Sequence, residues 1–356
     1  MYGSRIRIAR EICCMSQQEL GEKIGTSQAG VASLESGRYR PSSEFLEKIS
    51  MATGFGFNFF ELGELPELSA GSLLYRSQAS IKPSVKTHAH AHCLVAFDLA
   101  LRLSNKLKAI PVNIPRLSDR DPAQCARLMR ASLGLSPSTP IKNLIRTLEK
   151  SGVFVFGIPM EAEGLDGFSA WAGSKNERPV IALLEGKFGY RQHFTTSEEL
   201  GHLAMHHPLN ISQEDADKEA RLFAQEFLLP AEAMDLEMPR PVTLSGLSEM
   251  KPRWMVSIQL LVMRAEALGF TTPNQSRYLW QQISSRGWRK REPGDDIVQQ
   301  ESPRMLRAMA EVLYGTPLNM SKLSKDHGLP SKQIRSLFGV LDTPSRVLSF
   351  SGKKTI

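Results

Sequence analysis

The chain of 356 residues begins with hydrophobic positions at helical spacing. The apolar residues that carry this spacing are Ile6, Ile8, Ala9 and Ile12. Ser16 follows as an N-cap, with Glu19 three residues later as its capping-box partner. A second helix then ends at Gly25, which can supply the tight turn into a further helix over residues 27–35. The pattern predicts a helix-turn-helix motif.

The second helix of this motif carries polar and small residues on its outward face. Val31 and Leu34 are expected to face the core, which leaves the other face free to enter a major groove of DNA. Gln28 is the best candidate to read a base, because an amide can bond adenine N6 and N7 together. The predicted DNA-binding residues are Gln17 on a phosphate, Ser27, Gln28, Ala29 and Ser33 on the helix, and Arg38 and Arg40 on the DNA backbone. The alternative is a helical domain that binds protein.

The hydrophobic period changes in the middle of the chain. A Gly-, Pro- and Glu-containing stretch from about residue 62 to 80 indicates a boundary, and helices are expected over residues 85–108, 121–133 and 141–151. Three short β-rich runs follow at 153–159, 167–172 and 180–184, separated by turns that contain Gly or charged residues. These runs predict a small sheet.

The stretch FTTSEELGHLAMHH, residues 194–207, differs by one residue from an H-E-x-x-H zinc helix. In such a helix two imidazoles four residues apart bind Zn²⁺, and the Glu beside the first is the general base. Here Glu198 occupies the position of the first imidazole, Glu199 that of the base and His202 that of the second ligand. His206 lies four residues after His202, which leaves a displaced site on these two imidazoles as an alternative.

The last third of the chain reads as helical. An apolar helix is expected over residues 252–270, a short one over 278–283, and further helices over 305–313 and 318–338, where the pattern again looks like a helix-turn-helix. Packing or dimerisation is the expected role of that last unit. The basic stretch from Arg286 to Arg291 is expected to be a solvated loop.

Composition narrows the setting. Hydrophobic residues make up 41% of the chain and the net charge is +7, which is compatible with DNA as a partner. No apolar run approaches the roughly 20 residues of a membrane span, and the N-terminus lacks a secretory pattern, so we expect a cytoplasmic protein with no membrane partner. The four cysteines form no C-x-x-C pair, which argues against a disulfide framework or a zinc finger.

The segment MSQQELGEKIGTSQAGVASLESGRYRPS resembles the XRE (xenobiotic response element) family of regulators and the DNA-binding domain of phage λ-type repressors. The resemblance covers about residues 1–65. It implies a five-helix domain that binds double-stranded operator DNA as a homodimer on two half-sites.

The stretch FTTSEELGHLAMHH and the later KEARLFAQEFLLP together resemble the ImmA/IrrE metallopeptidases, whose usual motifs are RFTxAHELGHxxxH and EAxxFAxExLxP. The resemblance covers about residues 85–235 and implies a zinc site on Glu198, His202 and Glu219. Peptidases of this kind bind substrate along an edge strand of the sheet, for which residues 180–184 are the candidate. Two carboxylates and one imidazole would make metal-bound water less acidic, so we expect a degenerate site with weak or absent zinc and little catalysis.

The sequence therefore predicts a mainly α protein with a small α+β domain. The expected parts are a λ repressor-like domain (1–65), a linker (66–84), a zincin-like ImmA/IrrE domain (85–240) and a C-terminal helical domain (241–356). The expected function is a transcriptional regulator, for example a repressor of phage, mobile-element or stress genes, whose peptidase-like cleft binds a peptide, protein or small ligand. The alternatives are an active zinc peptidase that cleaves an XRE-type repressor, with Glu199 as its base, and an antitoxin-like protein that binds a toxin.

Overall fold

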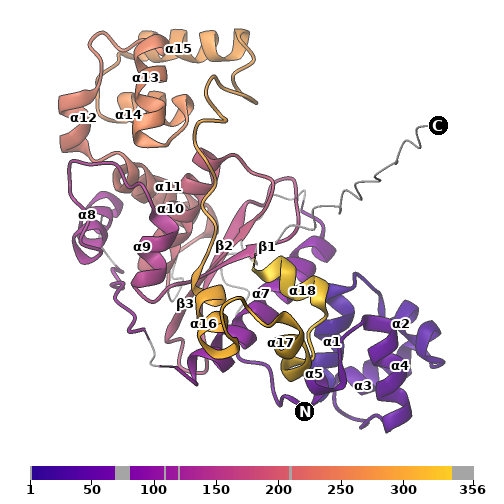
Figure 1. Ribbon diagram of the computed structural model, residues 1–356. Coiled ribbons are helices and arrows are strands. Elements are labelled where there is room, and N and C mark those ends of the chain that lie inside the picture. Colours follow the sequence, from indigo (N-terminus) through magenta and orange to yellow (C-terminus); the bar gives the residue numbers. More distant parts are fainter. Residues whose placement is uncertain (1, 69–80, 108–109, 119–120, 208–210, 339–356) are drawn as a thin grey trace, which may run out of the picture.

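The computed structural model describes residues 2–68, 81–107, 110–118, 121–207 and 211–338 (Figure 1). Five helices form the N-terminal part: α1 (Tyr2–Ile12), α2 (Gln17–Ile24), α3 (Gln28–Glu35), α4 (Ser43–Thr53) and α5 (Phe57–Glu61). The five-helix prediction is confirmed. Most of the predicted linker, residues 69–80, lies outside the described residues.

The local signals in the N-terminal sequence act as expected. Ser16 and Glu19 form the capping box of α2, and Gly25 ends that helix in the left-handed region with φ 75°. Val31 and Leu34 of α3 are 0% and 3% exposed. These two residues face the core, so the opposite face of α3 points away from it.

The sheet has three strands in the order β1-β3-β2: β1 (Phe154–Ile158), β3 (Arg178–Leu184) and β2 (Gly167–Ala172). β1 is parallel to β3 and β2 is antiparallel to it. Residues 180–184 thus lie in the central strand, and their prediction as a substrate-binding edge was wrong. The physical reason is that six consecutive residues of β3 are buried, which is typical of a strand covered on both faces.

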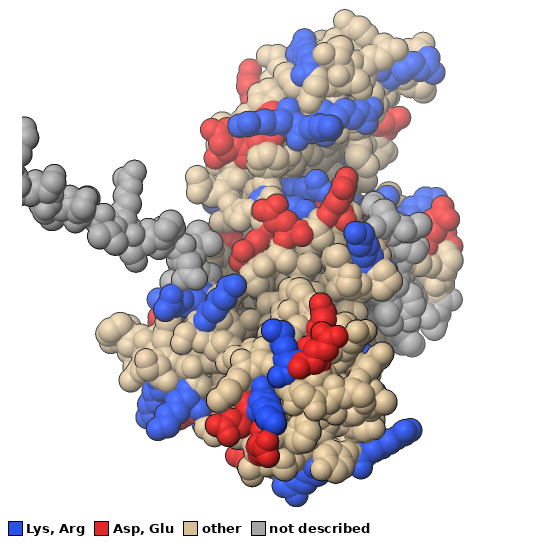
Figure 2. All heavy atoms as spheres, turned by 90° about the vertical axis from the view of Figure 1, so that its right-hand side faces the viewer, with Lys and Arg blue, Asp and Glu red and all other residues tan. Residues whose placement is uncertain are grey.

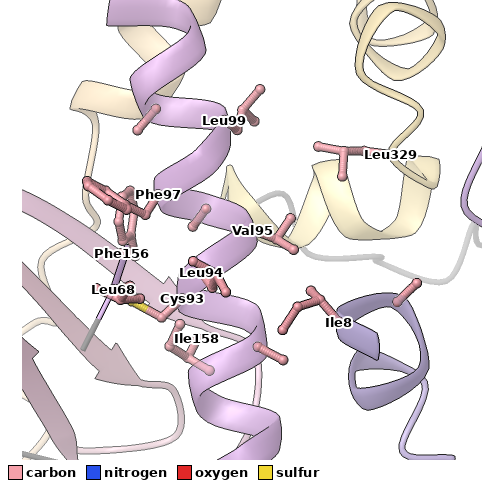
Figure 3. Close-up of a cluster of buried hydrophobic side chains, with 14 of the residues drawn as sticks. Ile8, Leu68, Cys93, Leu94, Val95, Phe97, Leu99, Phe156, Ile158 and Leu329 are labelled. Carbon is pink, nitrogen blue, oxygen red and sulfur yellow. The ribbon is translucent and has the colours of Figure 1, made fainter. Parts of the chain in front are cut away.

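Two hydrophobic cores lie on opposite faces of this sheet, because side chains alternate along each strand. Phe154 and Phe156 belong to the first core, which continues through α7 (Pro83–Ser104) into the N-terminal helices. Figure 3 shows Ile8 of α1 on one side of α7 and Phe156 of β1 on the other. Val155 belongs to the second core, which contains α8 (Pro122–Ser132), α9 (Leu144–Lys150), α10 (Gly189–Met205) and α11 (Gln213–Leu228). The N-terminal helices and the sheet therefore share one core.

Buried charge fixes α1 onto α7. Both terminal nitrogens of Arg5 donate to the Asp98 carboxylate at 3.0 Å, and the Arg5 side chain is 0% exposed. Arg102 donates to the same carboxylate at 3.1 Å. Burial lowers the pKa of Arg5, and the Asp98 carboxylate opposes that shift. Because an isolated charge is costly inside a protein, this pair ties the N-terminal helices to the rest of the molecule.

The described residues of the predicted C-terminal domain, 241–356, pack in two separate places. After α12 (Ala231–Glu237), the helices α13 (Leu244–Trp254), α14 (Ile258–Ala267) and α15 (Pro273–Ser285) form a lobe at one end of the molecule (Figure 1). The chain then returns, and α16 (Met305–Tyr314), α17 (Met320–His327) and α18 (Ser331–Leu337) join the first core. The Gly56 N–H donates to Gly328 O at 2.9 Å, so the first and last helical units touch.

The prediction of one apolar helix over residues 252–270 was wrong, because this range contains the end of α13 and the whole of α14. Pro252 stands in the last turn of α13, Met255 has φ 56°, and Ser257 caps α14 by accepting from Leu260 N. Apolar residues on both sides of this corner hid it from the hydrophobic pattern. Among the helices of the described ranges, none is long and apolar enough to cross a membrane.

Candidate DNA-binding and metal sites

The outward face of α3 is open to solvent. Gln28 and Ala29 are exposed and Ser33 is partly exposed, whereas Ser27 caps the helix by accepting from Gly30 N at 3.1 Å. Arg38 and Arg40 follow α3 and are exposed. Gln28, Arg38 and Arg40 are thus accessible on and after α3, and their contacts with DNA stay predictions.

Gln17 has an internal contact. Its amide nitrogen donates to Glu35 Oε2 at 2.9 Å, and Arg10 donates to Glu35 Oε1 at 2.6 Å. These bonds join the start of α2 to the end of α3 and to α1. Gln17 therefore lies beside the recognition helix, and a phosphate contact from it stays a prediction.

A second candidate site is a cavity of about 320 Å³ between α10 and α11. Its polar lining includes Asp166, Arg191, Glu198, His202, Asp217 and Arg221. The Arg191 guanidinium donates to the Asp166 carboxylate at 2.6 Å, and both residues line the cavity. The cavity thus presents carboxylates and guanidinium groups together.

Within this cavity the two predicted ligands from α10 face partners on α11. Glu198 Oε1 lies 3.5 Å from Arg221 Nε, and His202 Nε2 lies 3.5 Å from Asp217 Oδ1. The Arg221 cation therefore stands close to the carboxylate that replaces the first imidazole of the zinc motif. A cation at this position and a metal ion would repel each other.

The third predicted ligand, Glu219, has a different neighbour. Glu219 Oε2 lies 3.0 Å from His206 Nε2, and His206 Nδ1 lies 3.0 Å from His202 Nδ1. Glu219 is absent from the residues that line the cavity. In the part of the chain that the structure describes, no three His, Cys, Asp or Glu side chains are placed to hold a metal ion. The residues as arranged do not fit the zinc site of the resemblance.

Glu199, the predicted general base, lies on the sheet side of α10. It is 0% exposed, and Ser169 Oγ on β2 donates to its Oε2 at 2.8 Å. It is not among the residues that line the cavity. A general base must reach the proton that it removes, directly or through one water. In this geometry the hydrogen bond between Ser169 and Glu199 links β2 to α10. A catalytic role of Glu199 stays a prediction.

Sequence reasoning missed Asp166, Arg191, Asp217 and Arg221 of the cavity and Ser169 beside it. Asp217 and Arg221 are four residues apart and share a face of α11, and that spacing was a usable signal. Ser169 gave no signal, because its bond to Glu199 depends on how β2 packs against α10.

Two buried histidines flank these regions. Burial lowers the pKa of His193 on α10 to about 4, and its Nδ1 lies 3.3 Å from Met255 O. Burial, with a smaller effect of His88, lowers the pKa of His92 on α7 to about 4. Gln333 of α18 contacts His92 Nδ1 at 3.0 Å. Both imidazoles are therefore neutral at pH 7.

Comparison with known families agrees with the two motifs. Residues 6–60 match the family model described as helix-turn-helix, and residues 148–266 match the peptidase model described as IrrE N-terminal-like domain. A comparison with curated proteins finds no match. Both resemblances drawn from the sequence are confirmed.

Proposed function

We propose that this chain, which joins an XRE-type helix-turn-helix domain to an ImmA/IrrE-like domain, is a sequence-specific transcriptional regulator whose peptidase-like cleft senses a ligand without zinc. The proposal includes a homodimer on two operator half-sites, because one recognition helix reads only a few base pairs. A repressor of phage, mobile-element or stress genes is the expected form.

The outward face of α3 supports the DNA part of the proposal. Gln28 is exposed on α3 and Arg38 is exposed just after that helix, as base and phosphate readers must be. Arg5 and Asp98 tie this scaffold to α7, whose other side packs against β1. A change near the sheet can therefore move the recognition helices as one body.

The single observation that carries the sensor part is the pairing of Glu198 with Arg221. A positive guanidinium neutralises the carboxylate that a metal would otherwise compensate. The remaining cavity, with Asp166, Arg191 and Asp217, suits a small ligand or peptide end that carries both charges.

The test combines metal content with operator binding. Protein purified without chelator is analysed by elemental mass spectrometry beside Glu198→His, and its operator is found by selection from random duplexes. We expect far less than one zinc per natural chain together with nanomolar, sequence-specific binding. The matched control is Glu232→His, which places an imidazole at an exposed position of α12 outside the cavity lining and should leave both results unchanged.

Two outcomes would replace this proposal. About one zinc per natural chain, with cleavage of an XRE-type repressor that Glu199→Gln abolishes, would establish the active peptidase. A stable complex with a neighbouring toxin and no selected operator would establish the antitoxin.

A further inference from the structure

The lobe of α13–α15 carries a basic surface outside both matched segments. Residues 269–291 contain no Asp or Glu, and their five cations are all exposed. These cations are Arg277, Arg286, Arg289, Lys290 and Arg291. In Figure 2, basic side chains form a band across the end of the molecule where this lobe lies in Figure 1. The recognition helix α3 is near the other end.

The partners that the structure gives these cations are neutral. Arg277 donates to Asn274 Oδ1 at 3.3 Å and Arg289 to Ser284 Oγ at 3.1 Å. The Arg289 guanidinium lies 4.9 Å from the Trp280 ring centre, and that of Arg286 lies 5.1 Å from the Trp288 ring centre. Uncompensated cations held against aromatic rings form a surface that attracts phosphate.

The helix α15 presents one continuous polar face. Its buried side consists of Ser276, Leu279 and Ile283. Its exposed residues at helical spacing are Asn274, Arg277, Tyr278, Gln281 and Ser285. Asn, Gln and Arg are the side chains that read base edges, and a helix of 13 residues is long enough to enter a major groove.

The basic stretch after α15 is an exposed turn, as expected from the sequence, and it is anchored at both ends. Gln259 donates to Trp288 O at 3.3 Å, and the buried Glu292 accepts from Ile258 N at 2.7 Å and from Lys251 Nζ at 2.9 Å. The residues between Trp288 and Glu292 are therefore anchored at both ends. Fixed cations lose less conformational entropy when they bind phosphate than mobile ones do.

We propose that α15 and residues 286–291 form a second binding surface for duplex DNA, with α15 in a groove and the following cations on phosphates. The surface is distinct from α3, so one chain holds two DNA segments or two parts of one.

The test uses the full chain with α3 disabled by Gln28→Ala, Arg38→Ala and Arg40→Ala. Binding to a duplex of about 30 base pairs without operator is measured against salt concentration, before and after the further triple change Arg286→Ala, Arg289→Ala and Lys290→Ala. The matched control removes the same charge from exposed residues of and next to α9, by Lys142→Ala, Arg146→Ala and Lys150→Ala.

We expect the α15-side triple to weaken duplex binding at least tenfold and to reduce the slope of log K against log salt by about 3, at roughly 0.9 per phosphate. The α9 control should retain binding, and thermal unfolding should be unchanged in both. Equal loss in the two triples would overturn the proposal. Tighter binding to a single strand of the same length, or to phosphatidylserine vesicles, would also overturn it.

Discussion

The helix pairs α2–α3 and α10–α11 both match functional motifs, but the motif residues of the two pairs lie in opposite surroundings. On α3, Gln28 and Ala29 point to solvent. On α10, Glu198 and His202 face Arg221 and Asp217 of α11. Motif spacing determines which face of a helix a residue occupies. Whether that residue is free for a ligand depends on what the neighbouring helix presents to it.

The largest expected effect tests the buried ion pair that fixes α1, against which α3 of the first pair packs, to α7. Asp98→Ala leaves the buried Arg5 guanidinium without its bidentate partner, so we expect the free energy of unfolding to fall by about 3–5 kcal/mol. Urea unfolding measures it. Arg7→Ala is the control, because its ion pair with Glu11 is largely exposed on the Arg side and should contribute less than about 1 kcal/mol. Similar losses in the two variants would show that the buried ion pair does not fix α1 to α7.

A pH titration tests the burial of His92 on α7, which lies against the N-terminal helices, and of His193 on α10. His92 and His193 have pKa values lowered to about 4 by burial, so the unfolded chain binds more protons between pH 4 and 6.5. Their contribution to the free energy of unfolding is fully present above pH 6.5. It is lost as the pH falls towards 4, by up to about 3 kcal/mol for each imidazole. The free energy of unfolding, measured with urea at several pH values, should fall less steeply with decreasing pH in His92→Gln and in His193→Gln than in the natural protein. An unchanged slope in either variant would show that its imidazole titrates normally in the fold.

Base reading by the first pair has a smaller effect. Gln28→Ala should lower affinity by about 1–3 kcal/mol at one operator position, whereas Arg38→Ala should weaken binding to all sequences and reduce its salt slope by about one phosphate. Binding to operators with single base changes distinguishes the two. If both variants lose affinity equally on every sequence, Gln28 is not the reader.

The smallest effect concerns the second pair. Arg221 is 58% exposed, so Arg221→Ala should lower the free energy of unfolding by less than about 1 kcal/mol. Chemical unfolding measures this value. A loss of several kcal/mol would mean that the ion pair holds α10 and α11 together, and that the cleft is a structural contact.

Local signals predicted the first pair well. Ser16, Glu19 and Gly25 act through bonds to residues a few positions away, so their roles can be read from the sequence. The three strands were also found, because their apolar runs are short and bounded by turns. Their order was not, since the central place of β3 depends on which strands it meets.

The second pair shows what sequence reasoning leaves open. The resemblance assigns Glu219 to a metal, which stays a prediction, and the contact of Glu219 with His206 depends on how α11 packs against α10. Likewise, the position of α16–α18 depends on a return of the chain across the whole molecule. Such long-range contacts leave no periodic trace in the sequence.

The contact between Gly56 and Gly328 has a consequence for biosynthesis. A side chain at Gly328 would place its first carbon 2.2 Å from Phe59 N, so the two segments fit only backbone to backbone. The N-terminal helices leave the ribosome about 270 residues before the segment that covers them, a delay on the order of tens of seconds at usual translation rates. During that interval the side of α5 that α17 covers is open, and a chaperone that shields it should raise the yield of folded protein.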